Sequence, residues 1–336
     1  MALPRPERTV ERQAQLAEIY APIESELRDM EASLAAELSS PSEAVRRLLD
    51  HVSRYRGKRL RPALVFLSGK ATGWLKEEHV RLAVIIELIH TATLVHDDIL
   101  DDASTRRGVP SINAIYTNEV PVLLGDLIYA RAFSISTGLA DQTASRLLSD
   151  VTQVICRGEI DQIFARGEYD LPEKQYFKII EDKTAALYAA SAQLGAHYAG
   201  ARAEVAEAMW RYGLNLGIAF QIIDDCLDLT GIEGVVGKSL GTDLEKGKMT
   251  LPLIHLASEL EGRERDRLVE LLGDASLSGK REQLRDQFDL TMSLAYAQGK
   301  ADSYVRRALS ALPPLPESPS SRSFELIARY VLERDR

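Results

Sequence analysis

The sequence predicts an all-α fold, a bundle of ten or more helices in one domain. Strand patterns are scarce, whereas long stretches place apolar residues at the spacing of one helix face. Several of these stretches are apolar on nearly every side, so we expect their helices to be buried. No segment repeats with a fixed period, which argues against a solenoid.

The predicted helices follow one another along the chain. The clearest cover residues 11–38, 77–100, 142–167 and 204–229. Before another helix, Ser40 is expected as the N-cap, Pro41 as the first helical residue and Glu43 as the capping-box partner. Two loops stand out. One is rich in Gly and Lys, at 230–250, and the other is rich in Pro, at 312–323, before a last helix.

Composition and charge narrow the class of protein. The 336 residues are 45% hydrophobic and 27% charged, as in a globular protein, and the net charge of -9 argues against a nucleic-acid binder. Cys156 and Cys226 have no metal-type spacing and suit a reducing compartment. The first residues lack the apolar core of a signal peptide, and the most apolar run is too short to span a bilayer. We therefore expect a cytoplasmic protein without a transmembrane segment.

Two aspartate clusters follow the most apolar helices. "LVHDDILDDASTRRG" begins at Leu94, and "FQIIDDCLDLTG" begins at Phe220. Residues four apart share a helix face, so the pairs expected to meet are Asp97 with Asp101, Asp98 with Asp102, and Asp224 with Asp228, with Asp225 beside the last pair.

Like charges at that spacing destabilise a helix unless cations lie between them. A solvated acidic helix end is the alternative for either cluster alone. Because both clusters end helices that should be buried, we expect them to face each other across a cleft. Hard oxygen ligands of this kind suit Mg²⁺, which keeps several waters and usually also binds substrate phosphates.

Separate basic residues complete the pattern of a polyanion site. They are Lys58, Arg59 and Arg61 in "GKRLRP", Arg106 and Arg107 after the first aspartate cluster, Lys183, Lys238 and Lys248. Each alone could be an ordinary surface cation, but together they suggest two diphosphates. His90 lies two helical turns before Asp97, and a core histidine is the alternative reading there.

These residues together resemble the trans-isoprenyl diphosphate synthases. "DDILD" and "DDCLD" resemble the two aspartate-rich motifs of that family, and "RRG" follows the first. "GKRLRP", "GEIDQI", "KTAAL", "GIAFQIIDD" and "GKSLGTDLEKGKMTLPL" stand in the family's order. The likeness is greatest to the long-chain octaprenyl and related polyprenyl diphosphate synthases. One departure is Met249, where many relatives carry Pro.

The resemblance implies the isoprenoid synthase type I fold, with helices around a central cavity. It implies one domain over 1–336, with a helical extension to about residue 40, a catalytic core from about 41 to 310 and a C-terminal helix at about 322–336. It also implies Mg²⁺ as the cofactor, with three ions in each active site, and a homodimer.

The family's roles carry over by position. Asp97, Asp101 and Asp224 resemble the magnesium ligands, and Asp98, Asp225 and Asp228 support them. The expected binders of an allylic diphosphate are Arg106, Lys183, Lys238 and Lys248. The expected binders of isopentenyl diphosphate are Lys58, Arg61, His90 and Arg107. Thr184 and Gln221 would line the site where the allylic cation forms.

The implied reaction elongates an allylic primer such as farnesyl or geranylgeranyl diphosphate, for quinone side chains. In the family, a bulky residue five positions before the first aspartate stops elongation early. Here that residue is Ala92, so we expect a long all-trans product. Candidates for the deeper limit are Leu88 and Ile89, or Phe133 and Ser136 further along the chain, with ordinary core packing as the alternative for all of them. Release of so apolar a product suggests transient contact with a membrane.

Three alternatives stay open at this point. A shorter-chain farnesyl or geranylgeranyl diphosphate synthase would share every motif. A class I terpene cyclase would need no pocket for isopentenyl diphosphate and normally lacks a second "DDxxD". A non-catalytic subunit of a heteromeric synthase would have lost Asp or Arg ligands that this chain keeps.

Overall fold

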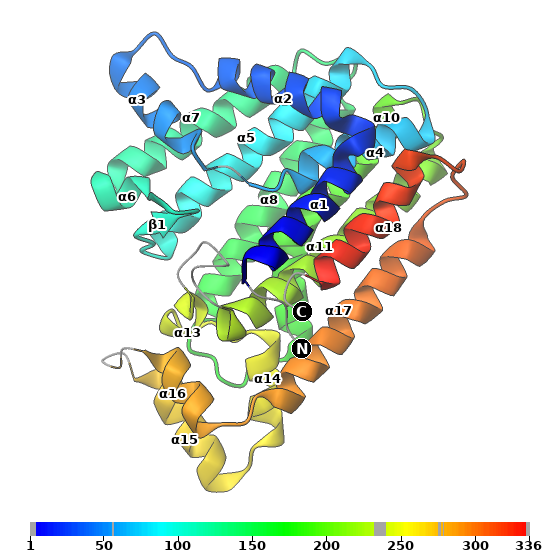
Figure 1. Ribbon diagram of the computed structural model, residues 1–336. Coiled ribbons are helices and arrows are strands. Elements are labelled where there is room, and N and C mark those ends of the chain that lie inside the picture. Colours follow the sequence, from blue (N-terminus) through cyan, green and yellow to red (C-terminus); the bar gives the residue numbers. More distant parts are fainter. Residues whose placement is uncertain (1–4, 56, 232–239, 275–276, 278, 334–336) are drawn as a thin grey trace.

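The computed structural model describes residues 5–55, 57–231, 240–274, 277 and 279–333, with side chains from residue 13 onward. The predicted all-α fold is confirmed (Figure 1). The helices are α1 (Arg5–Tyr20), η1 (Ala21–Ile23), α2 (Glu24–Glu37), α3 (Glu43–Val52), α4 (Leu60–Thr72), α5 (Glu77–Leu100), α6 (Ile112–Ile115), α7 (Glu119–Ser136), α8 (Thr143–Phe164), α9 (Glu173–Ile180), η2 (Glu181–Ala185), α10 (Ala186–Tyr198), α11 (Ala203–Thr230), α13 (Thr242–Glu245), α14 (Leu251–Glu259), α15 (Gly262–Gly273), α16 (Lys280–Gln287), α17 (Thr291–Ala311) and α18 (Pro319–Leu332).

A hairpin of two strands, each two residues long, is the only sheet in the described part of the chain. It pairs β1 (Thr105–Arg106) with β2 (Val109–Pro110) in antiparallel register. Arg107 and Gly108 form its turn, with φ of 52° and 77°. Two successive residues with positive φ are typical of the tight turns that match the twist of a hairpin. The hairpin follows the first aspartate cluster and sets the directions of the Arg106 and Arg107 side chains.

Helices α4, α5, α10 and α11 form the centre of the bundle, because each is buried around most of its circumference. Their apolar side chains join one continuous buried cluster. Glycines allow the closest approaches. An added Cβ at Gly213 would lie 2.5 Å from the carbonyl oxygen of Tyr188, and one at Gly217 would lie 2.6 Å from the Cα of Ala185. The middle of α11 therefore packs directly on η2 and α10.

The two ends of the chain pack against this centre from the same side. Helices α1 and α18 lie side by side, and α18 also contacts α4 and α11 (Figure 1). Helix α2 packs along α5, and α17 runs along α11. Within the described residues, none of the helices combines the length and the apolar character needed to cross a bilayer.

Two predicted helix starts need correction. Helix α3 begins at Glu43 with Ser42 as its N-cap, so Pro41 lies outside the helix. The Ser40 hydroxyl accepts a hydrogen bond of 3.3 Å from the Ser42 amide, which forms a turn instead of the predicted capping box. The last helix begins earlier than the predicted residue 322. Ser318 is its N-cap, and Pro319 occupies the first position. Proline is favoured there because its missing N–H needs no partner.

Candidate active site

A large cavity lies between the C-terminal ends of α5 and α11. Its volume is about 1280 Å³, and α4, α5, α8, η2 and α11 all contribute to its wall. Both aspartate clusters reach it, as the sequence predicts. The expected binding residues that line it are Lys58, Arg61, His90, Asp97, Asp101, Arg106, Arg107, Lys183, Thr184, Gln221, Asp224 and Lys248. Lys238 lies outside the described residues.

The first cluster is split by the end of α5. Asp97 lies in the last turn, Asp101 is the C-cap, and Asp102 turns out of the helix with a φ of 42°. The Asp102 carboxylate is therefore exposed and accepts a hydrogen bond from Lys246 at 2.7 Å. The expectation that Asp98 and Asp102 share a helix face is wrong, because the helix ends between them.

Asp98 points away from the cavity into the protein. Its carboxylate accepts a hydrogen bond of 2.7 Å from the Nε of Arg106, and it is 1% exposed. Burial raises the pKa of Asp98 to about 6 in spite of that guanidinium. Asp98 thus holds Arg106 against the end of α5, and Arg106 itself lines the cavity.

The second cluster divides its aspartates between the cavity and the core. Asp224 faces the cavity. Asp225 is buried, and it accepts hydrogen bonds from Tyr176 at 2.6 Å and from Gln221 at 2.7 Å. Asp228 is buried as well, and it accepts the amide of Asp243 at 3.3 Å. Asp225 also reaches the cavity wall, but Tyr176 and Gln221 already occupy its two carboxylate oxygens. Asp224 is therefore the aspartate of this cluster that is available to a ligand, while Asp225 and Asp228 fix its surroundings.

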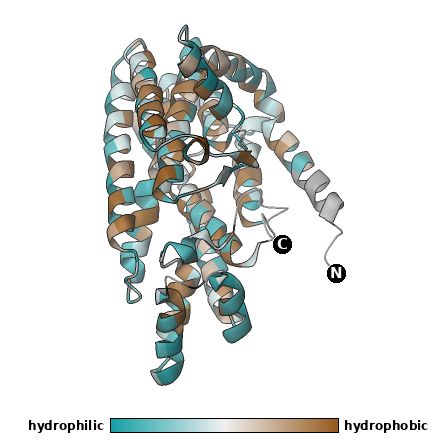
Figure 2. Cartoon of the chain, turned by 90° about the vertical axis from the view of Figure 1, so that its left-hand side faces the viewer, coloured by the Kyte–Doolittle hydropathy of each residue, from teal (hydrophilic) through white to brown (hydrophobic). Residues whose placement is uncertain are grey.

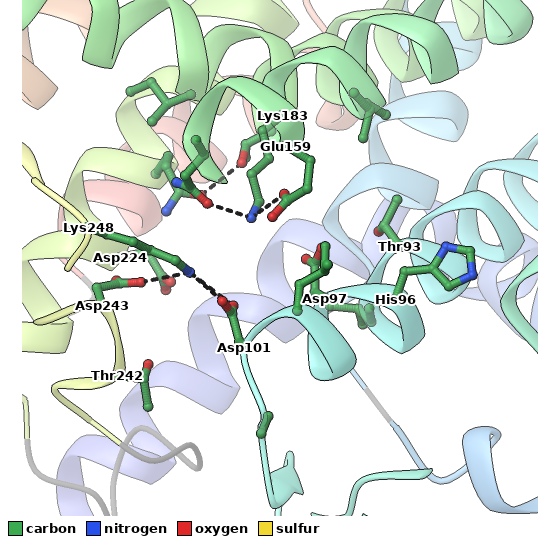
Figure 3. Close-up of a pocket in the computed structure, with 18 of the residues that line it drawn as sticks. Thr93, His96, Asp97, Asp101, Glu159, Lys183, Asp224, Thr242, Asp243 and Lys248 are labelled. Carbon is green, nitrogen blue, oxygen red and sulfur yellow. Dashed lines mark hydrogen bonds and ion pairs between the residues drawn. The ribbon is translucent and has the colours of Figure 1, made fainter. Parts of the chain in front are cut away.

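Lys248 joins the two sides of the cavity. Its ammonium lies 2.9 Å from the carboxylate of Asp101 and 3.3 Å from that of Asp243 (Figure 3). Burial opposes ionisation of Asp101, but Lys248 outweighs it and lowers the pKa of that carboxyl. Asp101 is thus held as an anion, and a cation already lies beside it.

The donor set fits Mg²⁺ bound together with a phosphate. Asp97, Asp101 and Asp224 offer hard carboxylate oxygens from facing helices. Among the residues with described positions, no three His, Cys, Asp or Glu side chains form a closed metal cage. Mg²⁺ seldom uses such a cage, because it keeps waters and takes one or two carboxylates plus substrate phosphates.

Lys183 enters the cavity from a turn with π-helical winding, η2. Single π-turns within helices are often found at functional sites. The Lys183 ammonium lies 2.5 Å from Glu159 and donates to the side-chain oxygen of Gln162 at 2.9 Å. Burial would lower the pKa of Lys183, but Asp97 and Glu159 raise it. The ammonium is therefore charged and lies on the Asp97 side of the cavity (Figure 3).

Thr184 and Gln221 meet where η2 packs on α11. The Thr184 hydroxyl donates to the Gln221 side-chain oxygen at 2.9 Å, and the Gln221 amide donates in turn to Asp225. Gly213, Gly217 and Gln221 are four residues apart and share one face of α11, so the glycine contacts position Gln221.

A separate basic group lies at the start of α4. The Arg61 guanidinium lies 3.3 Å from the Nε2 of His90 and packs 4.3 Å from the ring centre of Tyr188. Arg107 donates to the carbonyl of Tyr55 at 2.6 Å, and its guanidinium lies so close to Gly57 that any side chain there would collide with it. Burial, followed by Arg61 and Arg107, lowers the pKa of His90 well below its usual value, so the imidazole is neutral.

The predicted chain-length gate does not line the cavity. Ala92 is turned about 100° from Thr93, which does line the cavity. The α5 residues in the wall are Glu87, His90, Thr93, Leu94, His96, Asp97 and Leu100. Leu88, Ile89 and Ala92 are fully buried in the core instead, on a helix that packs along α7. The apolar part of the wall is formed by Thr93, Tyr129, Ile155, Cys156 and Ile160.

Four residues that contact the predicted site residues have no role assigned to them from the sequence. Glu159 and Gln162 hold Lys183, Tyr176 holds Asp225, and Arg166 lies 3.2 Å from Asp101. Glu159 and Gln162 fall within the "GEIDQI" motif, which could have identified them. Tyr176 and Arg166 lie in no motif, and only the fold brings them to the site.

A cavity enclosed by helices, with two acidic helix ends and two separate basic groups, is typical of the class of enzymes that act on diphosphates. The family model described as "Polyprenyl synthetase" matches residues 42–288. The octaprenyl diphosphate synthase of Escherichia coli is 33% identical over 305 residues, which cover 91% of this chain and 94% of that protein. The geranyl-diphosphate-specific all-trans-nonaprenyl-diphosphate synthase of Rhodobacter capsulatus is 36% identical and covers 94% and 97%.

A solved structure gives the same result. The polyprenyl synthase of Caulobacter crescentus CB15, complexed with calcium and isoprenyl diphosphate, superposes with a TM-score of 0.91 at 30% identity, covering 96% of this chain and 98% of that one. The chain belongs to the polyprenyl synthetase family and is a prenyltransferase.

Proposed function

We propose that this enzyme condenses isopentenyl diphosphate with an allylic diphosphate, in the presence of Mg²⁺, to make a long-chain all-trans polyprenyl diphosphate. The observation that carries the proposal is the arrangement of charge in one cavity. Carboxylates from α5 and α11 face each other, and two basic groups lie apart, one near Lys183 and one near Arg61. Two diphosphates need two such groups.

The allylic diphosphate is assigned to the aspartate side. Asp97, Asp101 and Asp224 would hold Mg²⁺, with Arg106, Lys183 and Lys248 as cationic partners of the phosphates. Bound Mg²⁺ would supply Lewis-acid stabilisation of the leaving diphosphate. Lys183 and Lys248 each lie against carboxylates in the protein without substrate, so phosphate oxygens would take over part of these contacts.

Isopentenyl diphosphate is assigned to Lys58, Arg61, His90 and Arg107. The neutral His90 imidazole can donate one hydrogen bond to a phosphate oxygen, while the guanidinium groups supply the charge. The reaction breaks the allylic C–O bond and forms a C–C bond to isopentenyl diphosphate. The proton lost from the new chain passes to the released diphosphate, so no side-chain nucleophile is needed.

The Thr184–Gln221 pair is assigned to the reacting carbon. Their oxygen atoms lie 2.9 Å apart beside the carboxylate end of the cavity, where an oxygen dipole favours developing positive charge. We assign a long product because the wall residues of α5 next to Ala92 are Thr93 and Leu94, neither of which is aromatic, and because the similar proteins include octaprenyl and nonaprenyl synthases. Farnesyl or geranylgeranyl diphosphate is the proposed primer, and quinone side chains are the proposed use.

We further infer that residues 1–336 act as one domain, in the cytoplasm, as a homodimer. One buried cluster extends from Ile19 to Val331, which supports a single domain. Exposed apolar side chains on neighbouring elements support a dimer. They are Ile115 and Tyr116 at the end of α6, and Val122, Leu123 and Leu127 on α7. We call these five residues the α6–α7 patch; Figure 2 views the molecule from that side.

The test is incubation of the purified protein with Mg²⁺, labelled isopentenyl diphosphate and farnesyl diphosphate, followed by reversed-phase chromatography. We expect labelled products that end at one dominant long chain. A product stopped at geranylgeranyl length would retain the reaction and reject the long chain. Hydrocarbon without label would indicate a cyclase, and activity only after addition of a second subunit would reject an autonomous enzyme.

A further inference from the structure

The turn that leads into α4 holds an unusual backbone conformation. Arg59 is the N-cap of α4 with φ of 54° and ψ of 30°, in the left-handed region. A side chain is disfavoured there, and such residues persist only where the surroundings hold them firmly. The turn carries Lys58 and Arg61 on either side of Arg59, and both line the cavity.

A partly buried ion triad holds Arg59. Its Nε donates to Glu31 of α2 at 2.7 Å, and its Nη1 pairs with Glu87 of α5. The Arg59 and Glu87 side chains are 13% and 4% exposed, whereas Glu31 is half-exposed. Charged hydrogen bonds to a buried partner are strong and directional. Arg59 thus connects the turn to two helices, and the buried Glu87 balances its charge.

Two further contacts hold the turn at Lys58. The Tyr20 hydroxyl donates to the Lys58 carbonyl, and the Lys58 ammonium lies 5.2 Å from the ring centre of Tyr330 on α18. Tyr20, Glu31 and Tyr330 all lie outside residues 42–288, the part that the family model matches. Both ends of the chain therefore contribute to the position of this turn.

We propose that Arg59, with its partners Glu31 and Glu87, is a positioning residue for isopentenyl diphosphate. The triad fixes the left-handed turn so that Lys58 and Arg61, three residues apart on either side of it, enter the cavity with a set separation. The inference rests on the proposed function, since it concerns the diphosphate subsite that contains Arg61 and His90. Arg59 also lines the cavity, but its guanidinium is engaged by Glu31 and Glu87, so we assign it a positioning role and not a substrate contact.

The test compares Arg59→Gly, Glu31→Gln and the wild type. Glycine keeps the left-handed conformation without strain but removes the triad. Binding of isopentenyl diphosphate alone is measured by calorimetry, because no turnover takes place without an allylic primer. KM for farnesyl diphosphate and the thermal midpoint are measured alongside. Glu24→Gln is the matched control, since Glu24 makes an exposed ion pair with Arg28 on the same helix.

We expect Arg59→Gly to weaken isopentenyl diphosphate binding about tenfold, the loss of one charged hydrogen bond. Glu31→Gln should weaken it roughly threefold, because Glu31 is half-exposed. KM for farnesyl diphosphate should stay the same in both variants, and Glu24→Gln should match the wild type.

Unchanged binding in Arg59→Gly would overturn the inference while leaving the proposed function intact. Equal weakening for both substrates would also overturn it, because that is the result of general loosening of the fold. If Arg59→Gly does not fold, Glu31→Gln decides, and wild-type affinity in that variant rejects the positioning role. A wild type that neither binds isopentenyl diphosphate nor incorporates it would reject the proposed function itself.

Discussion

At the scale of single residues, the site separates groups that touch a ligand from groups that hold them. Asp224 faces the cavity, whereas its neighbour Asp225 is buried against Tyr176 and Gln221. His90 lies in the wall beside Arg61 and is kept neutral by its surroundings. The adjacent aspartates therefore serve different purposes: Asp224 is available to a ligand, and Asp225 holds the side chains around it.

The neutral His90 makes stability depend on pH. Its pKa in the folded protein lies well below 6.5, so the unfolded chain binds one more proton in the acidic range. Acid therefore favours unfolding, by up to about 1.4 kcal/mol per pH unit below about pH 6.5. We expect urea unfolding at pH 5, 6 and 7 to show that loss in the wild type and a smaller loss in His90→Gln. Parallel profiles for the two proteins would contradict a depressed pKa.

The first cluster offers a matched pair of substitutions. Asp97 lines the cavity within α5, whereas Asp102 has left the helix and has an exposed side chain. Asp97→Asn should lower kcat about a hundredfold or more, because it removes a carboxylate proposed to hold Mg²⁺. Asp102→Asn should stay within a few-fold of the wild type. Steady-state kinetics at saturating Mg²⁺ measures both, and similar losses would remove the distinction.

Residue patterns predicted most of the site, but not the contacts between distant segments. The two clusters follow helices with clear periodicity, whereas the roles of the arginines and of Lys183 come from the resemblance of their motifs to the family. Lys248 beside Asp101 joins residues far apart in the chain, and no local pattern contains that contact. The side of α5 on which Ala92 lies could not be predicted either, because the facing side of an almost entirely apolar helix cannot be read from its periodicity.

At the scale of elements, the π-turn η2 depends on α8. Gly158 of α8 lies directly under it, and an added Cβ would be 2.7 Å from the amide nitrogen of Lys183. On the same side, Asp182 accepts hydrogen bonds from Arg157 of α8 at 2.9 Å and from Lys178 at 2.7 Å. The turn is thus held on α8 by a close backbone contact and by a buried carboxylate.

A single methyl group should therefore disturb this element. Gly158→Ala places a Cβ against the backbone of Lys183, which must move, and we expect a loss of about 1–3 kcal/mol in stability. KM for the allylic diphosphate should rise as well, because Lys183 moves. Gly299→Ala on α17 is the control, since nothing lies within 4 Å of its added Cβ. Urea unfolding and kinetics measure both variants, and equal stability would contradict the contact.

At the scale of the whole molecule, the architecture followed from the sequence more fully than the details did. The continuous apolar character of α5 and α11 predicted buried central helices, which the structure confirms. The hairpin at Arg107 was not predicted, because its two-residue strands are too short for a period to be seen. The contact between α1 and α18, near the two ends of the chain, depends on tertiary packing, which no local pattern in the sequence contains.

The α6–α7 patch supports a test of assembly. Leu123 is 68% exposed, so Leu123→Arg should cost the monomer little, but a dimer that uses this patch would bury an unpaired charge. We expect light scattering to show half the mass of the wild type. Met292→Arg, at a residue 71% exposed on α17, is the control and should stay dimeric. A wild-type monomer, or equal masses for all three, would reject this interface.

The contact between Lys58 and Tyr330 has a consequence for how the protein is made. The ribosome completes both aspartate clusters and the whole family region before it reaches α18. A nascent chain can therefore fold much of its acidic cavity while Lys58 still lacks its neighbour from the last helix. The basic pocket is complete only after α18 has been made, so a chain interrupted before α18 would carry the acidic half of the site without a complete basic half.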